Sequence, residues 1–259
     1  LRLGVLGGDV VPVLCGSAVK NIGVVTLMNT IERFFPSPSD AGEYHVKDLK
    51  ANKEESRKLD MNLPFSAQVF KTVADPFVGK ISMFKVMSGT VSSDTEVFNS
   101  NKEKKERLSG LFLLRGKKQL PMTKLVAGDI GAIAKLQFTT TGDTLCDPNN
   151  PVMFDALKFP EPNIAMAVEP KSKGDEDKIG SGLQRLMEED PTLKVEKNAE
   201  TRQTLISGIG EQHLEIVTKK LLNKFGVDVL IKDPKIPYRE TIKKSAKAEG
   251  KHKKQSGGH

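Results

Sequence analysis

The sequence predicts an α+β protein of several domains, in which a small antiparallel β-barrel precedes a ferredoxin-like domain with the element order βαββαβ. Three observations support this fold class. The chain has 259 residues, more than one domain usually contains. Short alternating segments separated by turn signals fill residues 63–158, and strand and helix patterns alternate over residues 159–235.

Bulk composition is that of an ordinary globular protein, with 37% hydrophobic and 28% charged residues. No apolar run reaches the roughly 18 residues that a membrane span needs, and no secretory signal opens the chain. Cys15 and Cys146 form no CxxC pair, so we interpret both as reduced, buried thiols of a cytosolic protein. We therefore expect a cytoplasmic monomer that has neither membrane nor DNA as a partner.

Residues 1–38 show the pattern of an α/β unit. The continuous apolar run at residues 9–15 predicts a strand that is buried on both faces, and the stripe of Val24, Leu27, Met28 and Ile31 predicts a helix that ends near Pro36. One strand and one helix cannot bury their own apolar faces, so we expect the remainder of a larger sheet upstream, in a longer protein. Residues 39–62 are polar and lack periodicity, which predicts a linker.

In residues 63–158, strands are predicted near 65–69, 81–85, 96–99, 107–114 and 129–138, and a closed barrel would remove their exposed edges. In residues 159–235, strands are predicted at 164–168, 193–197, 203–207 and 227–231. One helix follows the first of these strands and ends at Pro191, because the residue before a proline disfavours helix. The second helix follows the turn Gly208-Ile-Gly210 and ends at Gly226.

Catalytic and metal-binding constellations are not found in the sequence. No GxxxxGK[ST] loop occurs, and Asp177-Lys-Ile-Gly180 matches DxxG by chance. Glu211, His213 and Glu215 alternate at a spacing of two, which places neighbours on opposite sides of a helix, so no metal site and no catalytic residue are assigned. We expect His213 to hydrogen-bond a neighbouring element.

Charge is unevenly distributed along the chain. Seven Lys or Arg face two Glu in residues 236–259, which favours either an RNA-facing segment or a solvated basic face. The acidic run Glu188-Glu-Asp190 closes a predicted helix, where the helix dipole disfavours negative charge. Two interpretations of this run are open: it aids solubility, or it contacts a basic partner surface.

Several motifs together resemble the elongation factor G family of translational GTPases over nearly the whole chain. Its second domain is matched by Leu63-Pro-Phe-Ser-Ala67, Asp75-Pro-Phe-Val-Gly-Lys80 and Thr141-Gly-Asp-Thr-Leu-Cys146. Its third domain is matched by Glu189-Asp-Pro-Thr192 and Gly208-Ile-Gly-Glu-Gln-His-Leu-Glu215. Tyr238-Arg-Glu-Thr-Ile242 resembles the start of the fourth domain, placed at residues 236–259. Cys15-Gly-Ser-Ala-Val-Lys-Asn21 resembles the last guanine-contacting loop of the GTPase domain.

The resemblance implies a function for several residues. Ser17 and Ala18 would lie against the guanine base of GTP, bound with Mg²⁺ in a longer protein, whereas this chain alone would neither bind nor hydrolyse GTP. The ribosome, through its RNA and proteins, would be the partner. The barrel would touch small-subunit RNA, and the third domain would relay the nucleotide state during GTP-dependent movement of tRNA and mRNA. His213 would line an interdomain or antibiotic pocket, and Lys251, Lys253 and Lys254 would be candidate RNA contacts.

Two departures keep alternatives open. Ile209 and Gln212 stand where the family usually has Met and Leu, and Lys85-Val-Met replaces a more usual Arg-Val-Tyr. A divergent second copy of the factor, a ribosome-protection relative and a ribosome-recycling relative are therefore alternatives. A rival of another class is a free-standing RNA-binding module, although 5% aromatic residues without Trp give it few stacking side chains.

Overall fold

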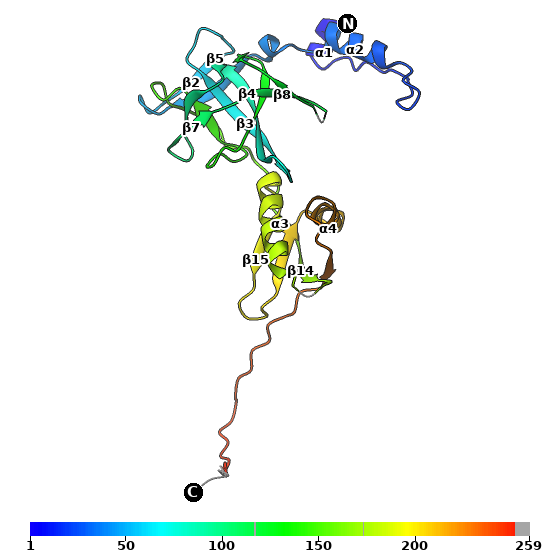
Figure 1. Ribbon diagram of the computed structural model, residues 1–259, viewed down its shortest axis with the longest axis vertical. Coiled ribbons are helices and arrows are strands. Elements are labelled where there is room, and N and C mark those ends of the chain that lie inside the picture. The colour runs from blue at the N-terminus through cyan, green and yellow to red at the C-terminus, as the bar shows by residue number, and fades with distance from the viewer. Residues whose placement is uncertain (117, 173, 252–259) are drawn as a thin grey trace.

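A computed structural model describes residues 1–116, 118–172 and 174–251 (Figure 1). Two helices, α1 (Arg2–Leu6) and α2 (Val24–Phe34), precede a barrel, and a smaller α/β domain follows it. Beyond Arg239, which pairs with Glu200, the described part of the chain runs away from both domains. Of the helices in the described residues, none is long and apolar enough to cross a membrane.

The barrel confirms the predicted β class of the middle region. Its main sheet has eight strands in the order β7-β6-β12-β3-β4-β11-β8-β9, and β5 pairs with β10 beside it. The apolar interior is built around side chains such as Phe84, Leu108 and Leu145, none of which is exposed to solvent. The strands are β3 (Ser66–Asp75), β4 (Gly79–Ser88), β5 (Thr90–Ser92), β6 (Thr95–Asn99), β7 (Lys104–Leu108), β8 (Phe112–Arg115), β9 (Lys118–Pro121), β10 (Lys124–Val126), β11 (Ile130–Ala134) and β12 (Thr144–Cys146).

Two predicted strands of the barrel have different bounds in the structure. The strand expected over residues 107–114 is divided into β7 and β8, because Gly110 turns the chain with a φ of 82°. The strand expected over 129–138 ends at Ala134, and Lys135 adopts a left-handed φ of 66°. The residues after it are held instead by Glu106, whose carboxylate accepts the backbone N–H groups of Gln137 and Thr139 at 2.7 and 2.8 Å.

The prediction of a linker over residues 39–62 is wrong in its central part. After a short 3-10 helix, η1 (Pro38–Ala41), the strands β1 (Glu43–Asp48) and β2 (Lys53–Lys58) form a hairpin, and β13 (Val152–Phe154) pairs with β1. Val46 on β1 is buried in a small apolar cluster with Val152 and Phe154. All residues of β2 except Ser56 are charged, as is usual for an edge strand. The alternation of apolar and polar residues that would predict a strand is therefore missing from the sequence.

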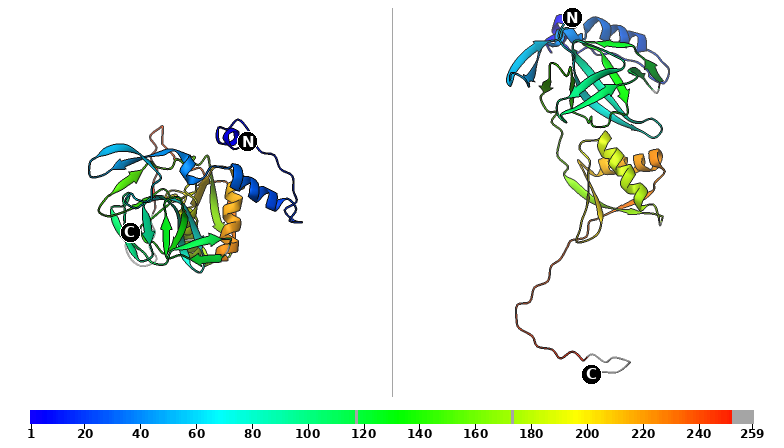
Figure 2. Two further views of the ribbon diagram at one scale, coloured as in Figure 1. Left: turned by 90° about the horizontal axis from the view of Figure 1, so that it is seen from above. Right: turned by 60° about the vertical axis from the view of Figure 1, so that its left-hand side comes forward.

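The second domain has the predicted βαββαβ order. Its elements are β14 (Ile164–Pro170), α3 (Glu176–Glu189), β15 (Lys194–Lys197), β16 (Thr204–Gly208), α4 (Glu211–Phe225) and β17 (Val229–Lys232). The antiparallel sheet has the order β15-β16-β14-β17, which places the first and third strands at its centre. Helices α3 and α4 cover one sheet face and lie between the sheet and the barrel (Figure 2).

The predicted strand at residues 9–15 is absent from the structure, whereas the predicted helix at α2 is confirmed. Residues 9–15 form an extended loop in which Val11 and Val13 are 79% and 91% exposed. A β-strand needs neighbours for its backbone hydrogen bonds, and the part of the chain that the structure describes offers none here. Cys146 is buried as predicted, but Cys15, at the end of this loop, is exposed.

Candidate functional site: a loop pocket and a histidine hinge

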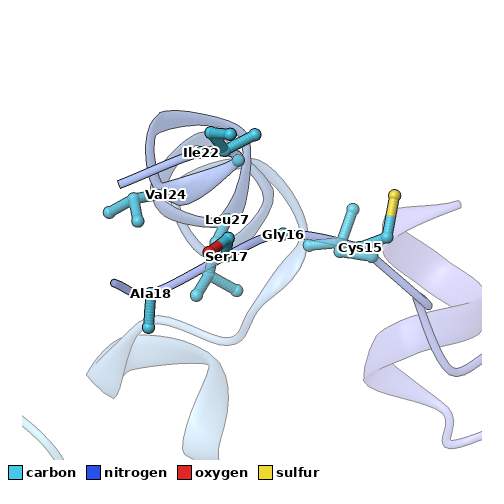
Figure 3. A pocket seen from close by; sticks show the side chains of 9 residues that line it. Cys15, Gly16, Ser17, Ala18, Ile22, Val24 and Leu27 are labelled. Carbon is cyan, nitrogen blue, oxygen red and sulfur yellow. The ribbon is translucent and has the colours of Figure 1, made fainter. Parts of the chain in front are cut away.

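The first candidate site is the loop that joins residues 14–18 to the start of α2. Ser17 and Ile22 exchange two backbone hydrogen bonds of 3.0 Å each, which closes a tight turn between them. Inside this turn, the hydroxyl of Ser17 accepts the N–H of Lys20 at 3.3 Å. Ser17 and Ala18 are both among the residues that line one pocket (Figure 3).

Two glycines allow this loop to pack closely. A Cβ on Gly16 would lie 2.6 Å from the carbonyl oxygen of Ile22, and a Cβ on Gly23 would lie 2.7 Å from that of Cys15. Gly23 also has a φ of 77°, which side chains disfavour. The motif that contains Gly16 could be found in the sequence, whereas the role of Gly23 could not. The only signal for Gly23 in the sequence is its position directly before the predicted helix.

The chemistry of this pocket is apolar and uncharged. The nine residues that line it include Leu14, Ile22, Val24 and Leu27, and none of the nine carries a charge. Such a pocket can hold a flat ring against its apolar side chains, with backbone groups and the Ser17 hydroxyl at its edge. It has no cation to neutralise a phosphate group.

The second candidate site is His213, near the start of α4. Its Nδ1 accepts the N–H of Ile209 at 3.2 Å, and its Nε2 lies 2.9 Å from Oδ2 of Asp190 at the end of α3. Because Nδ1 accepts a hydrogen bond, the ring proton of the neutral histidine is on Nε2 and is donated to Asp190. The prediction that His213 bonds a neighbouring element is confirmed. The histidine joins the glycine turn, α4 and α3 at one point.

Asp190 completes this arrangement. Its Oδ1 accepts two hydrogen bonds from Thr192, at 2.9 Å from the N–H and 2.6 Å from the hydroxyl. Burial raises the pKa of Asp190, but the bonds from Thr192 and His213 outweigh it, so the pKa lies below its ordinary value. A shallow pocket beside these groups is lined by Ile209, Gln212 and Ile216 together with Asp190 and His213. His213 is one of the residues that line this pocket, between the end of α3 and the start of α4.

Glu189 belongs to the acidic run for which the sequence left two interpretations open, solubility or contact with a basic surface. Its carboxylate accepts hydrogen bonds from Lys220 at 2.8 Å and Lys224 at 2.6 Å, both on α4. The same carboxylate accepts the backbone N–H of Ala74 in the barrel at 3.1 Å. The basic surface that Glu189 meets is thus inside this chain. No sequence signal pairs these residues, because 31 and 35 positions separate Glu189 from the two lysines.

The other predicted site residues are not brought together. Lys251 is exposed at the far end of the extended C-terminal segment, and Lys253 and Lys254 lie outside the described residues. Glu215 pairs with Lys219 at 3.8 Å on the surface of α4. Across residues 1–116, 118–172 and 174–251, no group of three or more His, Cys, Asp or Glu is placed to hold a metal ion.

Comparisons with known proteins agree with this architecture. The family model for domain 2 of elongation factor G matches residues 64–148, and the model for domain III of elongation factor G matches residues 159–233. A protein of Thermus thermophilus, known from a crystal structure, is 31% identical with a TM-score of 0.71. The similarity covers 94% of this chain and 34% of that one, so the chain spans about a third of the length of its relative. With two successive domains matched in the family's order, the chain belongs to the elongation factor G family.

Proposed function

We propose that this chain supplies the ribosome-contacting and conformation-relaying domains of a translation elongation factor in the cytoplasm. In this proposal the whole factor moves tRNA and mRNA through the ribosome at the expense of GTP. The observation that carries the proposal is the match of two consecutive domains to domains 2 and III of elongation factor G. The barrel would contact ribosomal RNA, and the α/β domain would transmit the nucleotide state.

The loop pocket supports a nucleotide role in part. Its apolar lining and the positions of Ser17 and Ala18 suit the flat face and edge of a guanine base. Its lack of charged residues, and the absence of a GxxxxGK[ST] loop from the sequence, provide nothing for the phosphates or Mg²⁺. When bound to the whole factor, GTP would supply the free energy of hydrolysis. Ser17 and Ala18 would only orient the base, and this chain alone would have no GTPase activity.

The hydrogen bonds of His213 to Ile209 and Asp190 support the relay role. His213 and Asp190 connect the start of α4 to the end of α3, so a displacement at the glycine turn is passed to both helices. The adjacent pocket at Ile209 and Ile216 is open to solvent on the helical side of the domain. A neighbouring domain of the factor, or an inhibitor, would lodge here against His213.

Ribosome co-sedimentation tests the proposal. The full-length factor that contains this chain should pellet with ribosomes in the presence of a non-hydrolysable GTP analogue, and much less in the presence of GDP. Generic single-stranded RNA at physiological salt should not retain the 259-residue chain. Retention on generic RNA, with no nucleotide-dependent pelleting of the factor, would instead support a free-standing RNA-binding module whose basic C-terminal residues make phosphate contacts.

A further inference from the structure

The end of strand β3 meets the helices of the second domain at an unpaired edge. Strand β12 pairs only with Ser66–Gln68 at the start of β3, and no other described strand covers that side near Ala74. The N–H of Ala74 donates to Oε2 of Glu189 at 3.1 Å, and its carbonyl accepts from Nζ of Lys224 at 3.2 Å. A carboxylate and an ammonium group thus take the places that a neighbouring strand would fill.

The two side chains that cap this edge are themselves an ion pair. Glu189 and Lys224 are bonded at 2.6 Å, and their side chains are only 12% and 27% exposed. Charge-assisted hydrogen bonds that are shielded from water are stronger than neutral ones. The pair therefore binds Ala74 through two directional bonds, and it fixes both the position and the orientation of the barrel edge.

The charged groups around Glu189 come from two elements in addition to its own helix. Lys220 and Lys224 face it from α4, and Asp75 of β3 lies close enough to Lys224 to attract it. Between the barrel and the α/β domain, α3 and β3 make the most extensive contact. The bond from Ala74 to Glu189 belongs to that contact and joins the C-terminal ends of β3 and α3. A contact held by polar bonds can open in water, where the same groups find other hydrogen-bond partners.

We propose that Glu189 and Lys224 form an electrostatic latch that holds the barrel and the α/β domain in one relative orientation and opens to let them turn. With the latch closed, Ala74 has both backbone groups bonded. With the latch open and the two domains turned apart, water would bond these two backbone groups instead. The use of this latch in relaying a nucleotide state rests on the proposed function, but the latch itself requires neither ribosome nor GTP.

The chain provides a matched control for the latch. Lys220 bonds Glu189 at 2.8 Å but has no bond to Ala74, so Lys220→Met removes an ion pair within one domain and leaves the latch bonds in place. Lys224→Met removes a similar charge together with the bond to Ala74. Glu189→Ala removes the acceptor from both lysines and from Ala74. The three variants separate the stability of the α/β domain from the connection between the domains.

Pulsed electron–electron distance measurements on the full 259-residue chain test the proposal. Spin labels on Lys104→Cys in the barrel and Lys197→Cys in the α/β domain use two exposed positions, in a Cys15→Ser background. We expect one narrow distance distribution for the unmodified latch and for Lys220→Met. In Lys224→Met and Glu189→Ala a second population should appear, and the ratio of latched to open molecules should fall roughly tenfold. High salt should broaden the distribution much less, because salt screens a shielded ion pair only weakly.

Two outcomes would overturn the latch. One is an unchanged, narrow distribution in Lys224→Met that is folded by circular dichroism. The other is equal broadening in Lys220→Met and Lys224→Met, which would place the effect in the α/β domain. If Glu189→Ala does not fold, Lys224→Met decides alone. Because no ribosome is present, failure of the latch leaves the ribosome proposal untouched, and failure of ribosome binding leaves the latch untouched.

Discussion

Asp190 accepts three hydrogen bonds at the end of α3, two from Thr192 and one from His213. This carboxylate holds the chain as it leaves the helix and also fixes the ring of His213. We expect Asp190→Ala to lower the free energy of unfolding by about 2 kcal/mol, because the donors on Thr192 and His213 lose a charged acceptor. Urea unfolding at pH 7 measures this loss. Asp190→Asn, which keeps an acceptor oxygen, should lose less than Asp190→Ala does.

The carboxylates at this helix end also predict how stability depends on pH. Burial raises the pKa of Glu189, but Lys220, Lys224 and the Ala74 N–H hold it below its ordinary value of 4.5, and the pKa of Asp190 lies below 3.8. A lowered folded-state pKa means that the unfolded state binds protons first. Their stabilisation is therefore present above these ordinary values and is lost as the pH falls through the lowered ones.

Urea midpoints measured between pH 7 and pH 3 check this dependence. Asp190→Asn should flatten the decline in stability at the acidic end, because one of the protonating groups is gone. The comparison is made in the acidic range, where the two carboxylates take up protons. An Asp190→Asn variant with the same acidic decline as the unmodified chain would refute this assignment.

At the same scale, the sequence allowed some contacts to be predicted and not others. The bond of His213 to another element could be expected because its spacing from Glu211 and Glu215 excluded a shared ligand set. The partners of Glu189 could not be expected, because they depend on how two helices cross and on where the barrel lies. Sequence spacing contains neither quantity.

Helices α3 and α4 cross closely at Gly182. A Cβ there would lie 2.5 Å from Cδ1 of Leu221, whose side chain is fully buried and has little room to move. Gly182→Ala should therefore destabilise the domain by about 1 kcal/mol, in spite of the better helix propensity of alanine. The matched control is Gly180→Ala, where nothing lies within 4 Å, and it should stabilise the helix by about 0.5–1 kcal/mol.

Thermal unfolding of the two alanine variants distinguishes the close crossing from simple propensity. The midpoint should fall for Gly182→Ala and rise for Gly180→Ala. A rise in both would mean that the helices separate at little cost, and that the crossing at Gly182 is loose.

The success of sequence-based prediction differs between elements for physical reasons. The α/β domain could be predicted in full order because each helix shows an apolar stripe and ends at a clear signal, such as Pro191 or Gly226. Hairpin β1–β2 could not, since one of its strands is almost wholly charged and its buried face depends on β13, about 100 residues away. The strand predicted at residues 9–15 does not form, because an apolar run becomes a strand only beside a partner strand.

In the whole molecule, two folded domains meet through α3 and β3, while α1 and α2 lie at one end of the chain and residues 236–251 at the other (Figure 1). The family could be inferred from the sequence alone, because its motifs occur in one order along the chain. The interdomain bonds at Ala74 and the two-glycine packing of the loop pocket required coordinates. The bonds at Ala74 join the barrel and the α/β domain through a polar contact.

Competition for the ribosome tests the central claim most directly. The labelled full-length factor that contains this chain is bound to ribosomes with a non-hydrolysable GTP analogue, and unlabelled elongation factor G is then titrated in. If the chain belongs to a ribosome-binding translocation factor, the two proteins share one site, and elongation factor G should displace the label completely. Retention of the label at saturating elongation factor G, or the absence of ribosome binding at the start, would contradict the proposed function.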